Sequence, residues 1–348
     1  MKDKNNDLFN LDKFIEESLY NKKTGYYMKK NPFGKKGDFV TAPSISILFS
    51  EMIAIWVISF WEKLNCPKEF NLIELGAGNG EMMRVLVSTF SKFPQFQKSC
   101  KINILEKSKL LQQTQKFNIK DKKIKWLNSL NELNNLPCIF IANEFFDALP
   151  IKQFLKKEKK WYERHVKFTE NKKLEYLDIP FDMQKFEKKI KFKISYGQKF
   201  IEYAPLTTMY LKTIINKIKI NNGGILILDY AYVEKEMKNT LQAVSRHKYC
   251  DVLKGFQNSD ITYNLSFNLI NKIIKRLGPC SSLSTTQKKF LIRLGILQRA
   301  EILSKNMLFK EKADIYFRIK RLIDESQMGH LFKVMFIANY KNKFKLGF

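Results

Sequence analysis

The stretch with the clearest chemical potential covers residues 72–80, where an apolar run passes into a loop with glycines at alternate positions. Gly76, Gly78 and Gly80 let the backbone bend sharply and approach a ligand where a Cβ would collide. An apolar strand, a tight turn and a following helix form the place where α/β folds hold nucleotide-like ligands. Glu74 lies inside the strand, so it would repel a pyrophosphate but suits a ligand with an ammonium group and no phosphates. S-adenosylmethionine is such a ligand.

A second acidic position, Glu106, ends a strand-like run over residues 101–106. In nucleotide-type sites such an acid binds the ribose, because one carboxylate can accept from both hydroxyls. The separation from the first glycine is longer than usual, and the connection around residues 94–99 can absorb the excess. An ordinary surface glutamate at a strand end is the alternative interpretation.

A polar cluster follows the apolar run 138–142 and contains Asn143, Glu144 and Asp147. Ligands of parallel sheets bind beyond the carboxyl ends of the strands, so these side chains are expected at the reaction site. The alternative is that Asn143 and Asp147 cap the next helix. Both interpretations can hold together.

The elements that must position these residues alternate between strand-like and helix-like patterns. Strands are expected near residues 72–75, 101–106, 123–127, 138–142, 223–230 and 331–337. This alternation predicts an α/β, Rossmann-like fold with a mainly parallel sheet. Two alternating stretches, 161–166 and 174–177, interrupt it and predict an inserted β-hairpin with helices nearby.

The N-terminal region is predicted to be helical at residues 8–19 and 45–64, the second helix being buried. Between them, residues 31–43 form a long irregular loop that contains Asp38 and is either a lid over the ligand or a structural Ω-loop. The division expected from these patterns is 1–65 (N-terminal helices and loop), 66–150 (first half of the core), 151–222 (insertion) and 223–348 (remainder of the core, with a substrate-side helical segment at 240–290).

Composition narrows the class of protein. The net charge of +28 invites a nucleic-acid or membrane interpretation, but Lys is spread along the whole chain, which favours a solvated surface. The five cysteines form no C-x-x-C pair, the first ten residues show no targeting signal, and no segment is apolar for long enough to span a bilayer. These features predict a cytoplasmic protein without membrane insertion. The three histidines are far apart in sequence and indicate no metal site.

Several blocks together resemble one known family, the MidA-type class I methyltransferases of bacteria and mitochondria. The blocks lie at residues 32–43, 74–80, 143–150, 240–243, 294–301 and 327–334. The resemblance implies a class I methyltransferase fold and an S-adenosylmethionine-dependent enzyme. For mitochondrial members it implies arginine dimethylation of a core subunit during assembly of respiratory complex I. The segment 260–267 departs from the family pattern, because Asn264 and Ser266 replace a His and an Asp, which leaves the substrate open.

Roles follow from this resemblance and from the residue chemistry. The cofactor site is expected to contain Glu74, Gly76, Ala77, Gly78, Gly80, Glu106, Asp38 and Asn143. In it Glu74 binds the ammonium group, Glu106 holds the ribose, and Asp38 closes over the site. The catalytic candidates are Glu144, Asp147 and Asn143. The two carboxylates would grip a substrate guanidinium in bidentate fashion, since its planar fork matches carboxylate geometry.

Other functions compete with protein arginine methylation. A nicotinamide-dependent oxidoreductase is disfavoured, because Glu81 occupies the position of the last glycine in the usual G-x-G-x-x-G loop. An RNA or small-molecule methyltransferase stays possible, although no basic–aromatic recognition motif stands out. A non-catalytic assembly chaperone that keeps the fold is the third alternative. The expected partner is a protein substrate, nucleic acid is disfavoured, and the oligomeric state is left open.

Overall fold

The computed structural model describes residues 8–34, 37–169, 171 and 173–348. Residues 1–7, within the stretch predicted to lack a targeting signal, lie outside the described residues. So do residues 35–36 of the predicted loop and residues 170 and 172 between the predicted hairpin strands.

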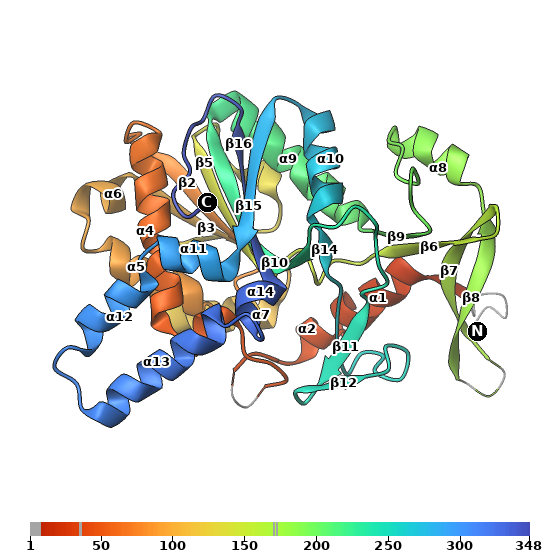
Figure 1. Cartoon of the computed structure of the whole chain (residues 1–348), viewed down its shortest axis with the longest axis horizontal. Helices are drawn as coiled ribbons and strands as arrows, with labels where there is room; N and C mark the ends of the chain where they lie inside the picture. Colours follow the sequence, from red (N-terminus) through yellow and green to blue (C-terminus); the bar gives the residue numbers. More distant parts are fainter. Residues whose placement is uncertain (1–7, 35–36, 170, 172) are drawn as a thin grey trace.

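The core is an eight-stranded sheet (Figure 1). Its strands are β2 (Phe70–Leu75), β3 (Cys100–Leu105), β4 (Lys125–Leu127), β5 (Cys138–Asn143), β10 (Gly223–Tyr232), β14 (Leu265–Ser266), β15 (Cys280–Thr286) and β16 (Phe332–Asn339). The order is β15-β16-β10-β5-β2-β3-β4, with β14 paired to the end of β10. The strands from β10 to β4 are parallel, as predicted. At the β15 edge the prediction does not hold, because β16 runs antiparallel to both β10 and β15, so the sheet as a whole is mixed.

Helices cover both faces of this sheet, and the alternation of side chains along each strand supplies both cores. On β10, Ile225 and Ile227 face one core, and Leu226 and Leu228 face the other. The first core is covered by α9 (Pro205–Asn221) and α10 (Phe267–Leu277), and the second by α4 (Ile47–Lys63) and α5 (Glu81–Phe90). The buried helix predicted at residues 45–64 is thus confirmed as α4.

The remaining helices are shorter or peripheral. They are α1 (Leu11–Tyr20), α2 (Tyr26–Lys29), α3 (Ala42–Ile45), α6 (Pro94–Ser99), α7 (Lys109–Ile119), a 3-10 turn (Leu130–Glu132), α8 (Met183–Ile190), α11 (Gln287–Arg293), α12 (Ile296–Ser304), α13 (Phe309–Ile323) and α14 (Met328–Leu331).

A second, antiparallel sheet contains the predicted hairpin. Its strands are β1 (Leu8–Asn10), β6 (Lys152–Lys157), β7 (Lys160–Phe168), β8 (Leu174–Phe181) and β9 (Phe200–Tyr203). The pairing of β7 with β8 confirms the hairpin. Sequence analysis missed β6, β9 and β1, and it began the first helix too early, at residue 8. A three-residue strand such as β1 has no periodicity of its own, and its partner β7 lies far along the chain.

A third sheet has the order β12-β11-β13 and is formed by β11 (Gln242–Ser245), β12 (Lys248–Cys250) and β13 (Asp260–Thr262). Segment 240–290, which was expected to be helical, therefore combines short strands with the single long helix α10. In this sheet Val244 is paired with both Tyr249 and Asp260, and Gln242 with Thr262. These five residues consequently share one face.

The division of the chain into four parts stays a prediction. Residues 151–222 contribute to two regions, since β6 to β9 build the antiparallel sheet while α9 packs against the core strands β5, β10 and β16.

Candidate active site

A cavity of about 710 Å³ opens beyond the carboxyl ends of the core strands. Glu106 reaches it from the end of β3, Glu144 and Asp147 from the loop after β5, and Asp260 from β13. The strand order reverses between β2 and β5, which is where doubly wound sheets leave a crevice for ligands. Another cavity, of about 660 Å³, lies at the starts of β2 and β3 and contains none of the predicted site residues.

The glycine loop has the backbone that its sequence requires. Gly76, Gly78 and Gly80 have φ angles of +66°, +53° and +82°, in the left-handed region that side chains disfavour. A Cβ on Gly76 would lie 2.8 Å from the ring of Phe145, and one on Gly78 would lie 3.2 Å from the ring of Phe33. Gly76 and Gly78 line the cavity, whereas the buried Ala77 and the helix-capping Gly80 support the loop from behind.

Glu74 lies just beneath this loop and is buried. Burial, followed by the nearby charge of Glu106, raises the pKa of the Glu74 carboxyl to about 8. Among the described residues its Oε2 atom has no hydrogen-bond partner. An unpaired buried carboxylate oxygen is costly by itself, so it fits a cationic group of a bound ligand.

Glu106 is held in place at the cavity wall. Its Oε1 accepts from the backbone N–H of Ser108 at 2.9 Å, and its Oε2 accepts from Nε2 of Gln115 at 3.0 Å. Burial raises the pKa of Glu106, and these two hydrogen bonds oppose the shift in part. Each carboxylate oxygen retains a lone pair, so the group can still accept from a pair of hydroxyls.

Glu144 occupies a strained backbone position at the end of β5. Its φ of +52° is uncommon for a residue with a side chain and costs about 1–2 kcal/mol. Its Oε1 accepts from the N–H of Ala42 at 3.4 Å and from Nδ2 of Asn143 at 3.2 Å. Burial raises the pKa of Glu144 to about 7. No helix follows directly, so the alternative that Asn143 and Asp147 cap one is wrong.

Asp147 belongs to a group of neighbouring carboxyls that also includes the partly exposed Glu144 and the buried Asp229 and Asp260. Burial, together with the charges of these three neighbours, raises the pKa of Asp147 well above its usual value. Among the described residues, none of the four carboxylates forms an ion pair with Lys, Arg or His. Glu144, Asp147 and Asp260, which line the cavity, therefore form a wall that favours a cationic ligand.

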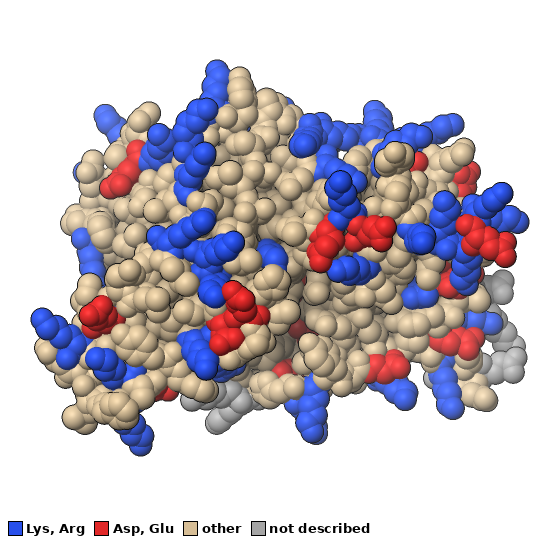
Figure 2. Space-filling view, viewed as in Figure 1, with Lys and Arg blue, Asp and Glu red and all other residues tan. Residues whose placement is uncertain are grey.

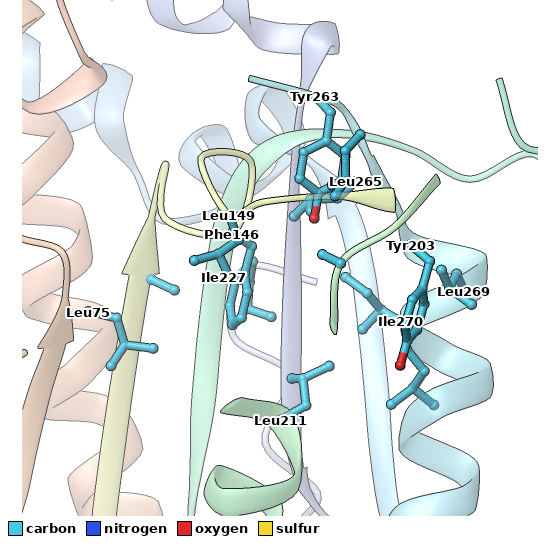
Figure 3. Close-up of a cluster of buried hydrophobic side chains, with 14 of the residues drawn as sticks. Leu75, Phe146, Leu149, Tyr203, Leu211, Ile227, Tyr263, Leu265, Leu269 and Ile270 are labelled. Carbon is cyan, nitrogen blue, oxygen red and sulfur yellow. The ribbon is translucent and has the colours of Figure 1, made fainter. Parts of the chain in front are cut away.

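Asp229 is a site residue that sequence analysis missed. It is fully buried near the end of β10, and its carboxylate accepts from the N–H groups of Phe146 and Tyr230 at 3.1 and 2.9 Å. It thereby fixes the loop that carries Glu144 and Asp147. Its position directly after the apolar run 225–228 was the signal available in the sequence. Figure 3 shows the apolar support below, where Phe146 and Leu149 of the loop lie beside Ile227.

Asp260 was also not among the predicted site residues, although its segment was. Its Oδ1 accepts from the hydroxyl of Tyr27 at 2.6 Å, and burial raises its pKa to about 7. Asn264 and Ser266, the departures from the family pattern, line a separate small cavity. Ser266 caps α10 by accepting from the N–H of Leu269. These two substitutions thus lie away from the wall that Asp260 forms.

Asp38 lines the cavity but directs its carboxylate to the protein. It accepts from the hydroxyl of Tyr26, from Nζ of Lys30 and from the N–H of Arg246. Burial alone would raise the pKa of Asp38, but the hydrogen bonds from Lys30, Tyr26 and Arg246 outweigh it, so the pKa is lowered. Asp38 consequently ties the N-terminal loop to the turn between β11 and β12.

The structure therefore brings Glu106, Glu144, Asp147 and Asp38 to one cavity, with Glu74 and Asn143 buried behind it. The part of the chain that the structure describes contains no group of three or more His, Cys, Asp or Glu suited to a metal ion. No described helix is long and apolar enough to cross a membrane.

Fold and site together define a class I S-adenosylmethionine-dependent methyltransferase. A family model described as "Putative S-adenosyl-L-methionine-dependent methyltransferase" matches residues 52–285, and the chain belongs to this family. The enzyme uses S-adenosylmethionine as its methyl donor, and the MidA-type resemblance is confirmed.

Curated relatives and a solved structure are also methyltransferases by name. The chain is 27% identical to "Protein arginine methyltransferase NDUFAF7, mitochondrial" of Xenopus tropicalis, over 93% of this chain and 80% of that protein. It is 26% identical to the human protein of that name, over 83% and 70%. The fold matches a "likely methyl transferase from Burkholderia thailandensis bound to S-adenosyl-homocysteine" with a TM-score of 0.81 and 21% identity, over 98% and 90% of the two chains.

Proposed function

We propose that this methyltransferase transfers methyl groups to an arginine side chain of a protein. The proposal rests on the wall formed by the carboxyls of Glu144, Asp147 and Asp260, which face one cavity without a basic partner among the described residues. A guanidinium matches this wall in charge and in bidentate geometry. The names of the curated relatives support the same substrate class.

The cofactor roles are proposed on the same geometry. The unpaired oxygen of Glu74 would bind the ammonium group, directly or through water, and Glu106 would hold the ribose hydroxyls. The glycine loop gives the methionine moiety close access to the backbone, and Asn143 supplies part of the wall behind it. S-adenosylmethionine supplies a sulfonium methyl that an aligned nitrogen can displace in line.

Glu144 and Asp147 would then orient the guanidinium and draw its positive charge toward the nitrogens that do not react. The pKa of Glu144, about 7, suits it to accept the proton that the methylated nitrogen releases. Asp229 positions both groups through the backbone of the loop, without contacting the substrate.

The proposal is tested by mass spectrometry of the source organism's proteome with and without this gene, where loss of a dimethyl mass shift on arginine is expected. In the same test, strains carry Glu144→Gln, Asp147→Asn or the control Asp121→Asn, at a partly exposed acid outside the cavity. We expect the first two variants to lose the mark while their purified proteins still bind S-adenosylmethionine. Full methylation by both variants, or a lost mark on RNA or a small molecule instead, would reject the arginine assignment.

The target protein and the location belong to this proposal as well. A subunit of respiratory complex I is the first candidate, because the resemblance to mitochondrial family members implies it. We retain the cytoplasmic location, which the five cysteines without a disulfide support; the mitochondrial location is stated only for the relatives.

A further inference from the structure

The turn between α12 and α13 exposes large apolar side chains. Ile302 is 68% exposed, Leu308 76%, Phe309 87% and Phe317 65%. Scattered exposed apolar residues are ordinary, but these four large side chains all belong to one helix–turn–helix unit, and such a group indicates an interaction surface. The methyltransferase site does not use these four residues, because none of them lines the cavity.

Helical spacing explains why α13 leaves this surface uncovered. Ile319 and Leu322 are buried and fix the inner face of the helix against the core. Tyr316 and Phe317 follow Phe309 by seven and eight positions, about two helical turns, and all three are exposed. They form an outer apolar stripe that runs along the helix from the turn.

Basic side chains border the stripe. Lys305, Lys310 and Lys312 are exposed, and among the described residues none of them forms an ion pair. Two neighbouring acids are engaged, because Glu311 accepts from the N–H of Leu308 and Asp314 pairs with Arg318, whereas Glu301 beside Ile302 is exposed without an ion pair among the described residues. Figure 2 shows the result at the lower left, where α12 and α13 join: an uncharged tip with blue atoms on its sides.

We propose that the tip of α12 and α13 docks peripherally on an anionic lipid surface, with Leu308 and Phe309 entering the interface and the surrounding lysines contacting headgroups. Exposed apolar side chains bordered by Lys are typical of helices that lie in a membrane interface. The net charge of +28, which methyl transfer to arginine does not require, adds attraction to anionic lipids.

A second copy of the chain is a poorer occupant of the same surface. A two-fold contact through this surface would bring Lys305, Lys310 and Lys312 of both copies into one interface, in a molecule that already carries +28. A convex tip also needs a matching pocket on a protein partner, whereas a lipid surface deforms to accept it. Nucleic acid would satisfy the lysines but not Leu308 and Phe309.

Docking has a geometrical consequence for the enzyme. Helix α13 runs from Phe309 at the tip to Arg321, which lines the active-site cavity. At about 1.5 Å per residue, this length of α13 places the cavity entrance at most on the order of 20 Å from the lipid surface. The enzyme is thereby brought to substrates at a membrane without a spanning helix.

The test is co-sedimentation of the full chain with vesicles of phosphatidylcholine containing about 30% phosphatidylserine, against vesicles of phosphatidylcholine alone. We expect binding to the anionic vesicles only. The double variant Leu308→Ser/Phe309→Ser should bind about tenfold more weakly. The matched control is Tyr196→Ser, which removes an equally exposed aromatic residue elsewhere (85%) and should change nothing.

A second measurement reports on insertion itself. In Phe309→Trp the new indole should shift to shorter emission wavelength on addition of anionic vesicles. Absence of binding to anionic vesicles overturns the proposal, and so does equal binding by wild type and the double variant, since charge alone would then account for it. If the double variant differed from wild type only in its oligomeric state, measured by sedimentation, the surface would be a contact with a second copy. If it differed only in RNA binding, the surface would bind nucleic acid.

Discussion

At the level of single residues, the unpaired Oε2 atom of Glu74 is the most direct sign of the cofactor. In the ligand-free protein the raised pKa of about 8 leaves this carboxyl protonated at neutral pH. An ammonium group requires the charged form, so binding must release the proton. A site of this kind binds its ligand more tightly as pH increases toward the pKa.

We therefore predict that affinity for S-adenosylmethionine increases by about tenfold or more between about pH 6 and about pH 8. In Glu74→Gln the affinity should be lower and this component of the pH dependence should disappear. Isothermal titration calorimetry measures both, with Glu144→Gln as the control that keeps Glu74 intact. An identical pH dependence in Glu74→Gln would show that another group titrates.

The protonation of Asp260 affects the stability of the folded chain. Its pKa is raised to about 7 in the folded chain, mainly by burial, so the folded state holds the proton more tightly than the unfolded state. The free energy of unfolding consequently decreases as pH increases from about 4 toward about 7. Asp260→Asn removes this loss and keeps an oxygen that can accept from Tyr27.

Urea unfolding of Asp260→Asn should show a gain relative to wild type that grows from about pH 5 to about pH 8 and reaches about 1–3 kcal/mol. The rate at which Asp260→Asn transfers methyl groups to arginine should be at least tenfold lower than the wild-type rate. Asp251→Asn, an exposed acid earlier in the same segment, is the control. A constant difference between variant and wild type across this pH range would contradict the account.

At the level of elements, the glycine loop combines two constraints that can be separated. Gly76 has a positive φ and also a neighbour, the ring of Phe145, where its Cβ would be. Gly197 has a positive φ of +72° but open space around it. Comparison of the two positions distinguishes backbone strain from crowding.

We predict that Gly197→Ala costs about 1–2 kcal/mol of stability, from backbone strain alone. Gly76→Ala should cost more and should also weaken S-adenosylmethionine binding at least tenfold, because Phe145 must move in the loop next to Glu144. Thermal unfolding and calorimetry provide the two readouts. If Gly76→Ala and Gly197→Ala lost the same stability and cofactor affinity stayed unchanged, the ring of Phe145 would move without affecting the fold or the site.

Local signals in the sequence predict some elements of the fold, whereas pairing between distant segments leaves others without a signal. The strand, glycine loop and helix around residues 70–90 could be predicted, because their apolar period and their glycines are local signals. Glu106 and the cluster after β5 were found for the same reason. Sheets that depend on distant pairing were missed: β1 pairs with β7, and β11 with β13, through registers that no local pattern encodes. Asp260 was not predicted because only the pairing of β13 with β11 brings it to the cavity, whereas Asp229 follows an apolar run on β10 and its local signal was available.

At the level of the whole molecule, the charge of +28 acts on stability. Figure 2 shows Lys and Arg distributed over the face in view, with acidic groups between them. Like charges at this density repel one another in the folded state more than in the expanded chain. Dissolved salt screens that repulsion over shorter distances as its concentration increases.

The thermal midpoint should therefore increase by several degrees between about 0.02 M and about 0.5 M sodium chloride. Calorimetry or circular dichroism measures the shift, and potassium chloride at equal ionic strength should produce the same one. A midpoint that falls with salt would mean that attractive ion pairs, such as that of Arg299 with Glu51, dominate instead.

The position of β16 has a consequence for synthesis of the protein. β16 lies between β10 and β15, so β15 joins the sheet only through residues 332–339. On the ribosome, β10 can pair with β5 early, but its other edge stays open until nearly all of the described chain has been made. During that interval β10 presents unpaired backbone groups and an apolar surface, the conditions under which a nascent chain aggregates or recruits a chaperone. The order of strands in the sheet thus sets a long period of vulnerability before the enzyme is complete.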